Sequence, residues 1–227
     1  MQTTWDALAS SPEVYVGDPR RGRQELDALF GRFSADPRGG TCVEVGCGPG
    51  RMTLPLAERF DRVLALDVSP AMVAQARSAA AAAGATNVEF RVVSGERLDG
   101  VAAGIGNVLV CYLVLQHLPS KALVLAYLRE FARLLAPGGE AFLQVPVLAS
   151  SRSARGRRLM RSAATPLLAR LSRDPARDAA FRGFRLTDGE LAAGLDRAGL
   201  RVLARLEEST PYRHSHDIFL RCARIEP

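Results

Sequence analysis

A short apolar segment followed directly by three closely spaced glycines is the feature that most constrains this chain. Residues 41–50 read Thr-Cys-Val-Glu-Val-Gly-Cys-Gly-Pro-Gly, so a strand that carries one acid, Glu44, leads into Gly46, Gly48 and Gly50. The pattern predicts a strand, a tight turn and the beginning of a helix. Because glycine has no Cβ and tolerates positive φ, a ligand can lie against the main chain there. We therefore expect a nucleoside cofactor at this turn.

The spacing of the glycines disfavours a dinucleotide such as NAD. The dinucleotide fingerprint G-x-G-x-x-G would place its third glycine at position 51, which is an arginine in this chain. The spacing E-x-G-x-G-x-G instead resembles the first motif of the class I S-adenosylmethionine-dependent methyltransferases, whose loop holds the methionine end and the ribose of the cofactor. The resemblance implies a set of cofactor-binding residues here: Glu44, Gly46, Cys47, Gly48, Gly50 and Arg51.

A second strand ends in a carboxylate at a suitable distance from the glycines. Residues 62–67 read Arg-Val-Leu-Ala-Leu-Asp, and Asp67 lies 21 positions after Gly46 (67 − 46). One helical crossover covers this separation, so Asp67 is expected at the carboxyl edge of the sheet, where it can accept hydrogen bonds from both ribose hydroxyls. Ser69 already provides an N-cap for the next helix, so Asp67 is not needed as a cap. Val68 and Met72 are expected to contact the cofactor as well.

The third strand departs from the family pattern at its end. Residues 87–93 alternate as a strand and are followed by Ser-Gly-Glu-Arg-Leu. In the family, an aspartate near this point commonly bonds the adenine amino group, and the alignment of the Glu-Arg-Leu run puts Ser94 in its place. A serine hydroxyl can still accept a hydrogen bond, and backbone groups of Gly95 and Glu96 can complete the contact.

The fourth strand leads into a segment that we expect at the active site. Residues 107–113 read Asn-Val-Leu-Val-Cys-Tyr-Leu, too apolar on both faces for anything but the middle of a parallel sheet. The next residues, Val-Leu-Gln-His-Leu-Pro, closely resemble the family's corresponding segment. The resemblance implies Cys111 and Gln116 as cofactor contacts. His117 is the candidate catalytic residue, as a general base if the acceptor must lose its proton early, or otherwise as part of the pocket wall.

The remaining motifs fall in the order of the family. A helix opened by Ser120 ends at Pro-Gly-Gly, residues 137–139, before a fifth strand at 140–145. Thr187 and Glu190 form a capping box, and Gly199 ends that helix before strands at 201–206 and 218–223. The resemblance implies an α/β, doubly wound, Rossmann-like methyltransferase fold. Its seven-stranded, mostly parallel sheet would have the order 3-2-1-4-5-7-6, with strand 7 antiparallel.

Two regions lie outside the resemblance, and we expect them to carry specificity within a single methyltransferase domain, residues 1–227. Residues 1–33 look like an N-terminal lid helix region, in which Tyr15 is a candidate cofactor contact. Residues 146–184 form a basic insertion expected over the acceptor site. Residues 151–185 contain ten arginines and two acids, a net charge of +8 (10 − 2), whereas the whole chain carries +6. Such a cover would attract an anionic acceptor, or would merely be a solvated helical pair.

Composition excludes several classes of protein. No stretch of about 18 uncharged apolar residues exists, and the N-terminal residues lack the basic and apolar blocks of a secretory signal, so we expect a cytoplasmic protein with no membrane contact. The four cysteines contain no C-x-x-C pair and are expected to be buried free thiols. His214 and His216 lack a nearby third ligand, so no metal site is predicted.

The sequence favours one function and leaves two alternatives. The first is transfer of the methyl group of S-adenosylmethionine to an oxygen or nitrogen of a small-molecule acceptor, with S-adenosylhomocysteine as product and the enzyme a monomer or homodimer. The second is an RNA-modifying methyltransferase that grips RNA with the basic insertion. Nucleic acid is disfavoured because residues 151–180 contain no interleaved aromatic side chains for stacking on bases. The third is a cofactor-binding protein without catalysis.

Overall fold

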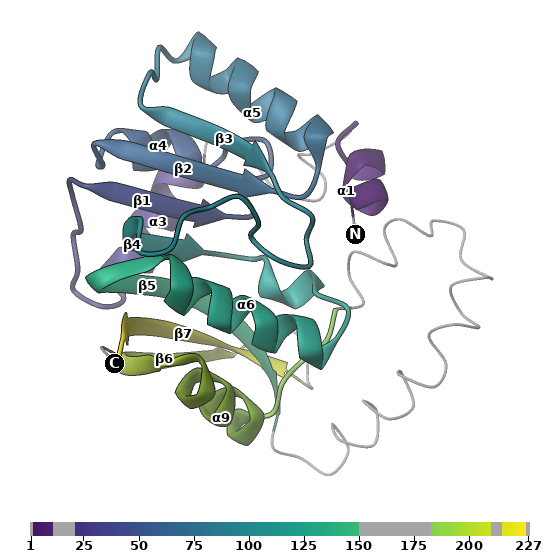
Figure 1. The fold of residues 1–227 in the computed structure, drawn as a ribbon, viewed down its shortest axis with the longest axis vertical. Helices are drawn as coiled ribbons and strands as arrows, with labels where there is room; N and C mark the ends of the chain where they lie inside the picture. The colour runs from purple at the N-terminus through teal and green to yellow at the C-terminus, as the bar shows by residue number, and fades with distance from the viewer. Residues whose placement is uncertain (1, 11–20, 150–182, 210–214, 226–227) are drawn as a thin grey trace.

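Seven strands form one sheet in the order β3-β2-β1-β4-β5-β7-β6 (Figure 1). The computed structural model describes residues 2–10, 21–149, 183–209 and 215–225. Neighbouring strands are parallel except for β7, which is antiparallel to both β5 and β6. The order and direction predicted from the sequence are therefore confirmed. The strands are β1 (Thr41–Val45), β2 (Arg62–Asp67), β3 (Val88–Val92), β4 (Gly106–Cys111), β5 (Leu135–Leu148), β6 (Leu200–Ser209) and β7 (Ser215–Arg224).

Helices cover both faces of this sheet. Figure 1 shows α6 (Lys121–Leu134) and α9 (Asp188–Ala198) in front of the sheet, with α3 (Gly22–Gly31) and α4 (Thr53–Ala57) behind it. Helix α5 (Pro70–Ala82) contributes Val73, Ala76 and Ala80 to the same apolar cluster as α3 and α4. A short 3-10 helix, η2 (Leu115–His117), follows β4. The described residues thus form three layers, helix on sheet on helix.

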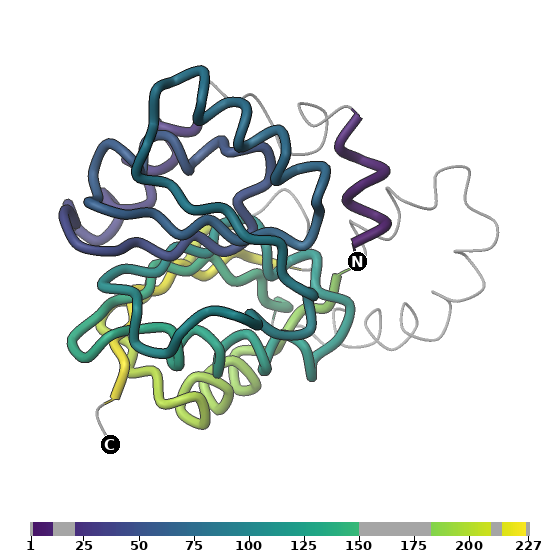
Figure 2. Tube along the Cα trace, turned by 45° about the horizontal axis from the view of Figure 1, so that its top comes forward, coloured from purple at the N-terminus to yellow at the C-terminus, as the bar shows by residue number. Residues whose placement is uncertain are grey.

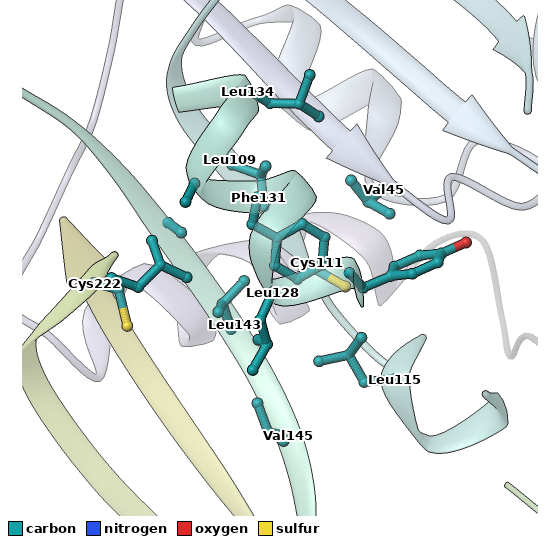
Figure 3. Close-up of a cluster of buried hydrophobic side chains, with 14 of the residues drawn as sticks. Val45, Leu109, Cys111, Leu115, Leu128, Phe131, Leu134, Leu143, Val145 and Cys222 are labelled. Atoms are coloured by element: carbon teal, nitrogen blue, oxygen red, sulfur yellow. The ribbon is translucent and has the colours of Figure 1, made fainter. Parts of the chain in front are cut away.

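The alternation of apolar side chains along the central strands produces two cores. On β1 and β2, Val43 and Leu64 point to the layer of α6 and α9, whereas Cys42 and Val63 point to the layer of α3, α4 and α5. Figure 3 shows part of the first core, in which Phe131 of α6 lies among strand and helix side chains. Phe131 is fully buried, and truncation of such a side chain costs about 3–5 kcal/mol of stability.

The helix ends follow the caps that the sequence predicts. Ser69 and Ser120 accept hydrogen bonds from the backbone N–H groups three residues later, at the beginnings of α5 and α6. Thr187 and Glu190 form the complete capping box of α9, and Gly199 ends that helix in the left-handed conformation. Each cap satisfies a backbone group that the helix itself leaves unpaired.

Several element boundaries differ from the sequence predictions, and β6 and β7 are both longer than predicted. The helix predicted after the glycine turn is regular only in α4, because residues 50–52 and 58–59 form turns. Helix α6 ends at Leu134, and β5 already begins at Leu135 and contains the Pro-Gly-Gly segment. The register between β4 and β5 shifts there, from the pair Gly106–Leu135 to the pair Val108–Glu140. At its other end β5 continues to Leu148, three residues into the region predicted as the basic insertion.

The N-terminal helices occupy two different places. Helix α3, which the sequence places in the lid region, is part of the core, with Leu26 and Leu29 fully buried. Helix α1 (Gln2–Leu8) lies beyond the carboxyl ends of the first strands, next to α5, in both Figure 1 and Figure 2. Any covering role at that edge of the sheet therefore belongs to α1 among the described residues.

Candidate functional site

A cavity of about 1040 Å³, its open mouth included, lies at the carboxyl edge of β1, β2 and β4. This edge is where ligands of open parallel α/β sheets bind, because the loops of neighbouring crossovers diverge there. The cavity wall is built from five segments: α1, the glycine loop after β1, the end of β2 with the start of α5, the loop after β3, and residues 110–118. Tyr127 of α6 completes the wall.

The glycine loop brings bare main chain to the cavity. Gly46 and Gly48 have φ angles of 78° and 53°, which few other residues adopt without strain. A Cβ on Gly46 would lie 2.2 Å from Val114 Cγ2, so the absence of a side chain allows the segment after β4 to pack directly on the loop. Gly50 has a different role, since its missing side chain makes room for Ala76 of α5.

Asp67 ties the glycine loop to the beginning of α5. Its Oδ2 accepts the Gly48 N–H at 2.8 Å, and its Oδ1 accepts the Ser69 N–H at 2.9 Å. Burial raises the pKa of Asp67, and the hydrogen bonds from the Ser69, Gly48 and Val68 backbone oppose this effect. Each carboxylate oxygen has a second lone pair. Asp67 can therefore hold the loop and still accept hydrogen bonds from a ligand in the cavity.

Glu44 is a buried carboxyl group beneath the loop, with an exposed fraction of 5%. Burial raises its pKa to about 7, while the Thr53 hydroxyl, which donates to Glu44 Oε2 at 2.6 Å, opposes the shift. Arg51 also lies on the wall, and its guanidinium forms an ion pair with Glu25 of α3. The cavity thus has an acidic floor that gains a proton near neutral pH.

Aromatic and amide side chains form another part of the cavity wall. Trp5 of α1 packs edge-to-face on His117, with 4.9 Å between ring centroids. The Gln116 amide donates to His117 Nε2 at 3.1 Å, so the lone pair of that nitrogen is already in use. Residues 183–185 lie against the same segment: the Phe184 N–H donates to Leu118 O, and the Arg185 guanidinium to Gln116 O.

The structure brings ten of the sixteen predicted site residues to the cavity wall. They are Glu44, Gly46, Cys47, Gly48, Arg51, Asp67, Val68, Met72, Gln116 and His117.

Five others lie elsewhere, and Tyr15 falls outside the described residues. Gly50 faces α5, and Cys111 lies inside the core shown in Figure 3. The Ser94 hydroxyl is exposed and bonds Asp99, whereas Gly95 and Glu96 are absent from the wall. His214 is also outside the described residues.

Several wall residues were not predicted from the sequence. Trp5, Tyr112, Leu113, Leu98 and Tyr127 come from helices or loops whose place over the cavity depends on tertiary packing. The Tyr127 hydroxyl donates to Gly95 O at 3.2 Å and so anchors the loop after β3. An aromatic residue at a buried helical position gives no sequence signal for such a role, because it is equally suited to ordinary core packing.

The cavity fits an adenosyl cofactor. Main chain without Cβ atoms lies beside a carboxylate with free lone pairs, and Val68, Met72 and Leu98 provide apolar surface next to them. A ribose needs hydrogen-bond acceptors, and a purine needs a flat apolar slot. Among the described residues, no group of three His, Cys, Asp or Glu side chains has the geometry of a metal site. All four cysteines are buried and free, as the sequence predicts.

Comparisons with known proteins agree with this geometry. Residues 42–139 match a family described as "Methyltransferase domain". The chain is 32% identical over 139 residues to a ubiquinone biosynthesis O-methyltransferase of Xanthomonas axonopodis pv. citri. The aligned region covers 61% of this chain and 54% of the relative. The chain therefore spans about half the length of the curated relatives it matches.

Solved structures share the fold at low sequence identity. A magnesium protoporphyrin IX methyltransferase from Synechocystis PCC 6803, with bound S-adenosylhomocysteine, has a TM-score of 0.61 and 21% identity, covering 92% of this chain and 87% of that one. A cyclase has a TM-score of 0.63 and 16% identity, covering 90% and 81%.

The strand order, the cavity and the matched domain are those expected of a class I S-adenosylmethionine-dependent methyltransferase. Residues 42–139 are the part of the chain that matches the methyltransferase domain, and S-adenosylmethionine is the cofactor of that class. The resemblance drawn from the sequence motifs is thereby confirmed.

Proposed function

We propose that the chain transfers the methyl group of S-adenosylmethionine to an oxygen or nitrogen atom of a small-molecule acceptor. The observation that carries this proposal is one cavity whose wall contains both Asp67 with the glycine loop and Trp5 with His117. A cofactor held by Asp67 and the glycine loop would share this cavity with an acceptor that contacts Trp5 and His117. The sulfonium of the cofactor supplies an activated methyl group, so the protein mainly has to align the acceptor and exclude water.

The proposed cofactor residues contact different parts of the cofactor. Asp67 accepts hydrogen bonds from the ribose hydroxyls, and Gly46, Cys47 and Gly48 lie against the methionine end. Val68 and Met72 contact the adenine. Ser94, Gly95 and Glu96 stay a prediction for the adenine amino group, and Tyr127 supports that loop from behind by its bond to Gly95 O. Glu44 and Arg51 set the charge beneath the loop.

His117 is proposed as the residue that meets the acceptor. Its ring lies on the cavity wall between Trp5 and Gln116. His117 could act as a general base or as part of the cavity wall, and the two roles have different structural requirements. A general base needs a free lone pair near the acceptor proton, and here Gln116 would have to release Nε2. A wall residue needs only the present packing against Trp5, which is the arrangement that the structure contains.

An oxygen acceptor on a flat ring is the preferred substrate class. The curated relative named above is an O-methyltransferase by name, and aromatic side chains such as Trp5 and His117 pack well against a planar acceptor. The arginine-rich residues 151–182 lie outside the described part of the chain, so their place over the acceptor stays a prediction. Within the described wall, Arg51 is the cationic side chain, and Glu25 already neutralises it.

One experiment distinguishes methyl transfer from the alternative functions. The first experiment combines a thermal shift with S-adenosylhomocysteine or NADH and a methyl-transfer screen with acidic, phenolic and amine acceptors. We expect S-adenosylhomocysteine alone to raise the melting temperature, and at least one phenolic acceptor to be methylated. Because a cyclase shares this fold, cofactor binding without methylation of any acceptor would favour a protein without methyl-transfer activity. Salt-sensitive binding to total RNA would favour the RNA alternative.

Location and assembly stay predictions. Among the described residues, no helix is long and apolar enough to cross a membrane. A cytoplasmic location and a monomer or homodimer are expected, and size-exclusion chromatography with light scattering measures the assembly directly.

A further inference from the structure

The left-handed backbone of Leu113 is unusual, and its own sequence neighbours do not explain it. Leu113 has a φ of 58°, in a region that bulky residues rarely occupy because Cβ crowds the backbone. It follows β4 by two residues, and its side chain lines the cavity. A strained residue of this kind persists only where the surrounding structure holds it. A contact that holds Leu113 must therefore come from another part of the chain.

Gln144 of β5 makes that contact. Its Oε1 accepts the Leu113 N–H at 3.1 Å, and the side chain is fully buried. The last pair between β4 and β5 joins Cys111 to Leu143, so Gln144 lies beside the chain as it leaves the sheet. Central strands normally carry apolar side chains here, because a buried amide is unfavourable unless it is bonded. The bond to Leu113 gives the amide oxygen a partner, whereas the buried Nε2 has no hydrogen bond among the described residues and interacts with the Asp217 carboxylate of β7.

The conformation of Leu113 determines where the next residues lie. Val114 packs so closely on the glycine loop that its Cγ2 is 2.2 Å from the position of a Cβ on Gly46. Residues 115–117 then form η2, which puts Gln116 and His117 on the cavity wall. If Leu113 returned to negative φ, the chain would leave β4 in another direction, and both contacts would shift together.

We propose that Gln144 is a positioning residue of the enzyme. By holding the main chain of Leu113 in its strained conformation, it fixes the 114–118 segment against the glycine loop and so sets the distance between the acceptor side and the cofactor side of the cavity. Gln144 lies outside the cavity wall. The effect on methyl transfer rests on the proposed function. The effect on the segment itself does not.

The first test is Gln144→Met, which keeps the size of the side chain and removes the acceptor oxygen. Because a misplacement of about 1 Å can cost about 100-fold in rate, we expect kcat to fall by at least about tenfold. Affinity for S-adenosylhomocysteine should change by less than about threefold, since the Asp67 contacts of the cofactor remain. A kcat equal to that of the wild type would overturn the proposal, as would equal losses in kcat and affinity.

A second readout needs no acceptor and therefore separates this inference from the proposed function. Trp5 is the only tryptophan of the chain and packs on His117. A displaced 114–118 segment would loosen this contact, so acrylamide should quench Trp5 fluorescence more strongly in Gln144→Met than in the wild type. If the chain methylates no acceptor, the quenching result still decides the structural claim. Unchanged quenching would contradict it.

Substitutions of Leu113 test the strain itself. Glycine adopts this conformation without strain, so the loss caused by Gln144→Met should shrink to about threefold or less in a Leu113→Gly background. In a Leu113→Ala background, which keeps the strain, the full loss should remain. If Gln144→Met alone does not fold, the double variant Leu113→Gly with Gln144→Met still allows the comparison with Leu113→Gly. Equal losses in the glycine and alanine backgrounds would overturn the mechanism.

The matched control is Asn87→Leu at the opposite edge of the sheet. Asn87 Nδ2 donates to Ala57 O and Phe60 O, so this variant also loses a partly buried bond from a side-chain amide to the backbone. We expect it to lower the melting temperature without changing kcat or Trp5 quenching. An equal loss of kcat in the control would mean that the Gln144 effect is only a general loss of stability.

Discussion

Asp67 is the residue on which cofactor binding should depend most. Its carboxylate keeps lone pairs toward the cavity while it holds the Gly48 and Ser69 N–H groups. We expect Asp67→Ala to weaken binding of S-adenosylhomocysteine by about 1.5–3 kcal/mol, the value of hydrogen bonds to a charged acceptor. Isothermal titration calorimetry measures this directly. Unchanged affinity would remove Asp67 from the cofactor site.

A second aspartate provides the control for this substitution. Asp61 Oδ2 accepts the Gly40 N–H at the amino edge of the sheet, remote from the cavity. Asp61→Ala therefore also deletes a carboxylate that bonds the backbone, and it should leave the affinity for S-adenosylhomocysteine unchanged. A similar loss of affinity in both variants would point to a general effect on the fold.

Glu44 should make the stability of the protein depend on pH near neutrality. Its pKa in the folded state is about 7 because of burial, against an ordinary value of 4.5. A raised carboxyl pKa means that the folded protein binds the proton more tightly, so the stability linked to protonation is present below about pH 4.5 and is lost as pH rises through 7. The full loss is about 3 kcal/mol. Glu44→Gln mimics the protonated form and should remove this part of the pH dependence.

The comparison of Glu44→Gln with the wild type should therefore be made across this window. Denaturant unfolding at pH 5 should give nearly equal stabilities, and at pH 8 the variant should be more stable, because it carries no buried charge. Asp67 also has a raised pKa from burial and is present in both proteins, so only its repulsion of the Glu44 charge, which raises the pKa of Glu44, remains in the difference. A constant difference across the window would show that Glu44 does not titrate there.

At the scale of residues, the sequence predicts what is local and misses what depends on distant neighbours. Glu44 and Asp67 were found because a polar residue at the end of an apolar strand is conspicuous, and their place at the carboxyl edge follows from parallel topology. Gly50 and Cys111 were assigned to the cofactor by motif, although their neighbours are Ala76 and the core. The Gln144 contact with Leu113 joins residues 31 positions apart, so no local pattern reports it.

At the scale of elements, α1 should act as a wall that a few contacts hold in place. Asp6 accepts hydrogen bonds from the Ser69 hydroxyl and from the Ala71 N–H at the beginning of α5, where the helix dipole favours a negative charge. The Gln75 amide donates to Ala9 O. Trp5 thereby reaches the cavity. The helix is only seven residues long, so its order depends on these contacts and not on its own helical tendency.

Asp6→Ala should consequently release α1 from the cavity. We expect stronger acrylamide quenching of Trp5 and affinity for S-adenosylhomocysteine lower by about 1 kcal/mol, a typical value for a charge at a helix N-terminus. Thr3→Ala changes an exposed residue of the same helix and should alter neither quantity. If Asp6→Ala behaves like Thr3→Ala in both measurements, the docking contacts do not hold the wall.

Element boundaries were predicted well where a side chain caps the helix and poorly where tertiary packing decides. Ser69, Ser120 and Thr187 each bond the backbone of their own helix, so their effect can be predicted from adjacent residues. The beginning of β5 could not be predicted in this way. The pairing of Leu135 with Gly106 extends the strand through a Pro-Gly-Gly segment, and such a segment normally ends a strand. Likewise α3 looked like a lid, although its apolar face is buried in the core.

At the scale of the whole molecule, positive charge is concentrated in one stretch of the chain. Residues 151–185 carry a net charge of +8, so the rest of the chain carries about −2, since the total is +6. Most of that stretch lies outside the described residues. Its last member, Arg185, bonds Gln116 O beside the cavity. The chain therefore enters the cavity region from the arginine-rich stretch, and an anionic acceptor would be attracted toward it.

Replacement of Arg155, Arg157 and Arg158 together by glutamine tests this attraction. Because long-range steering acts on capture of the acceptor, we expect its KM to rise and to become less dependent on salt. Affinity for S-adenosylhomocysteine should change by less than about 0.5 kcal/mol, as for surface substitutions remote from a site. The measurement is steady-state methyl transfer to the best anionic acceptor between low and physiological ionic strength.

The control removes the same charge from the amino edge of the sheet. Arg38, Arg62 and Arg201 are exposed at or near the amino ends of β1, β2 and β6, and replacing all three by glutamine also lowers the net charge by three. If the charge of the arginine-rich stretch attracts the acceptor, KM should respond to the first triple variant and not to the second. Equal responses would assign the effect to net charge alone. No response in either variant would leave the arginines as solvated surface and would favour a neutral acceptor, since a neutral molecule feels no long-range attraction to either set.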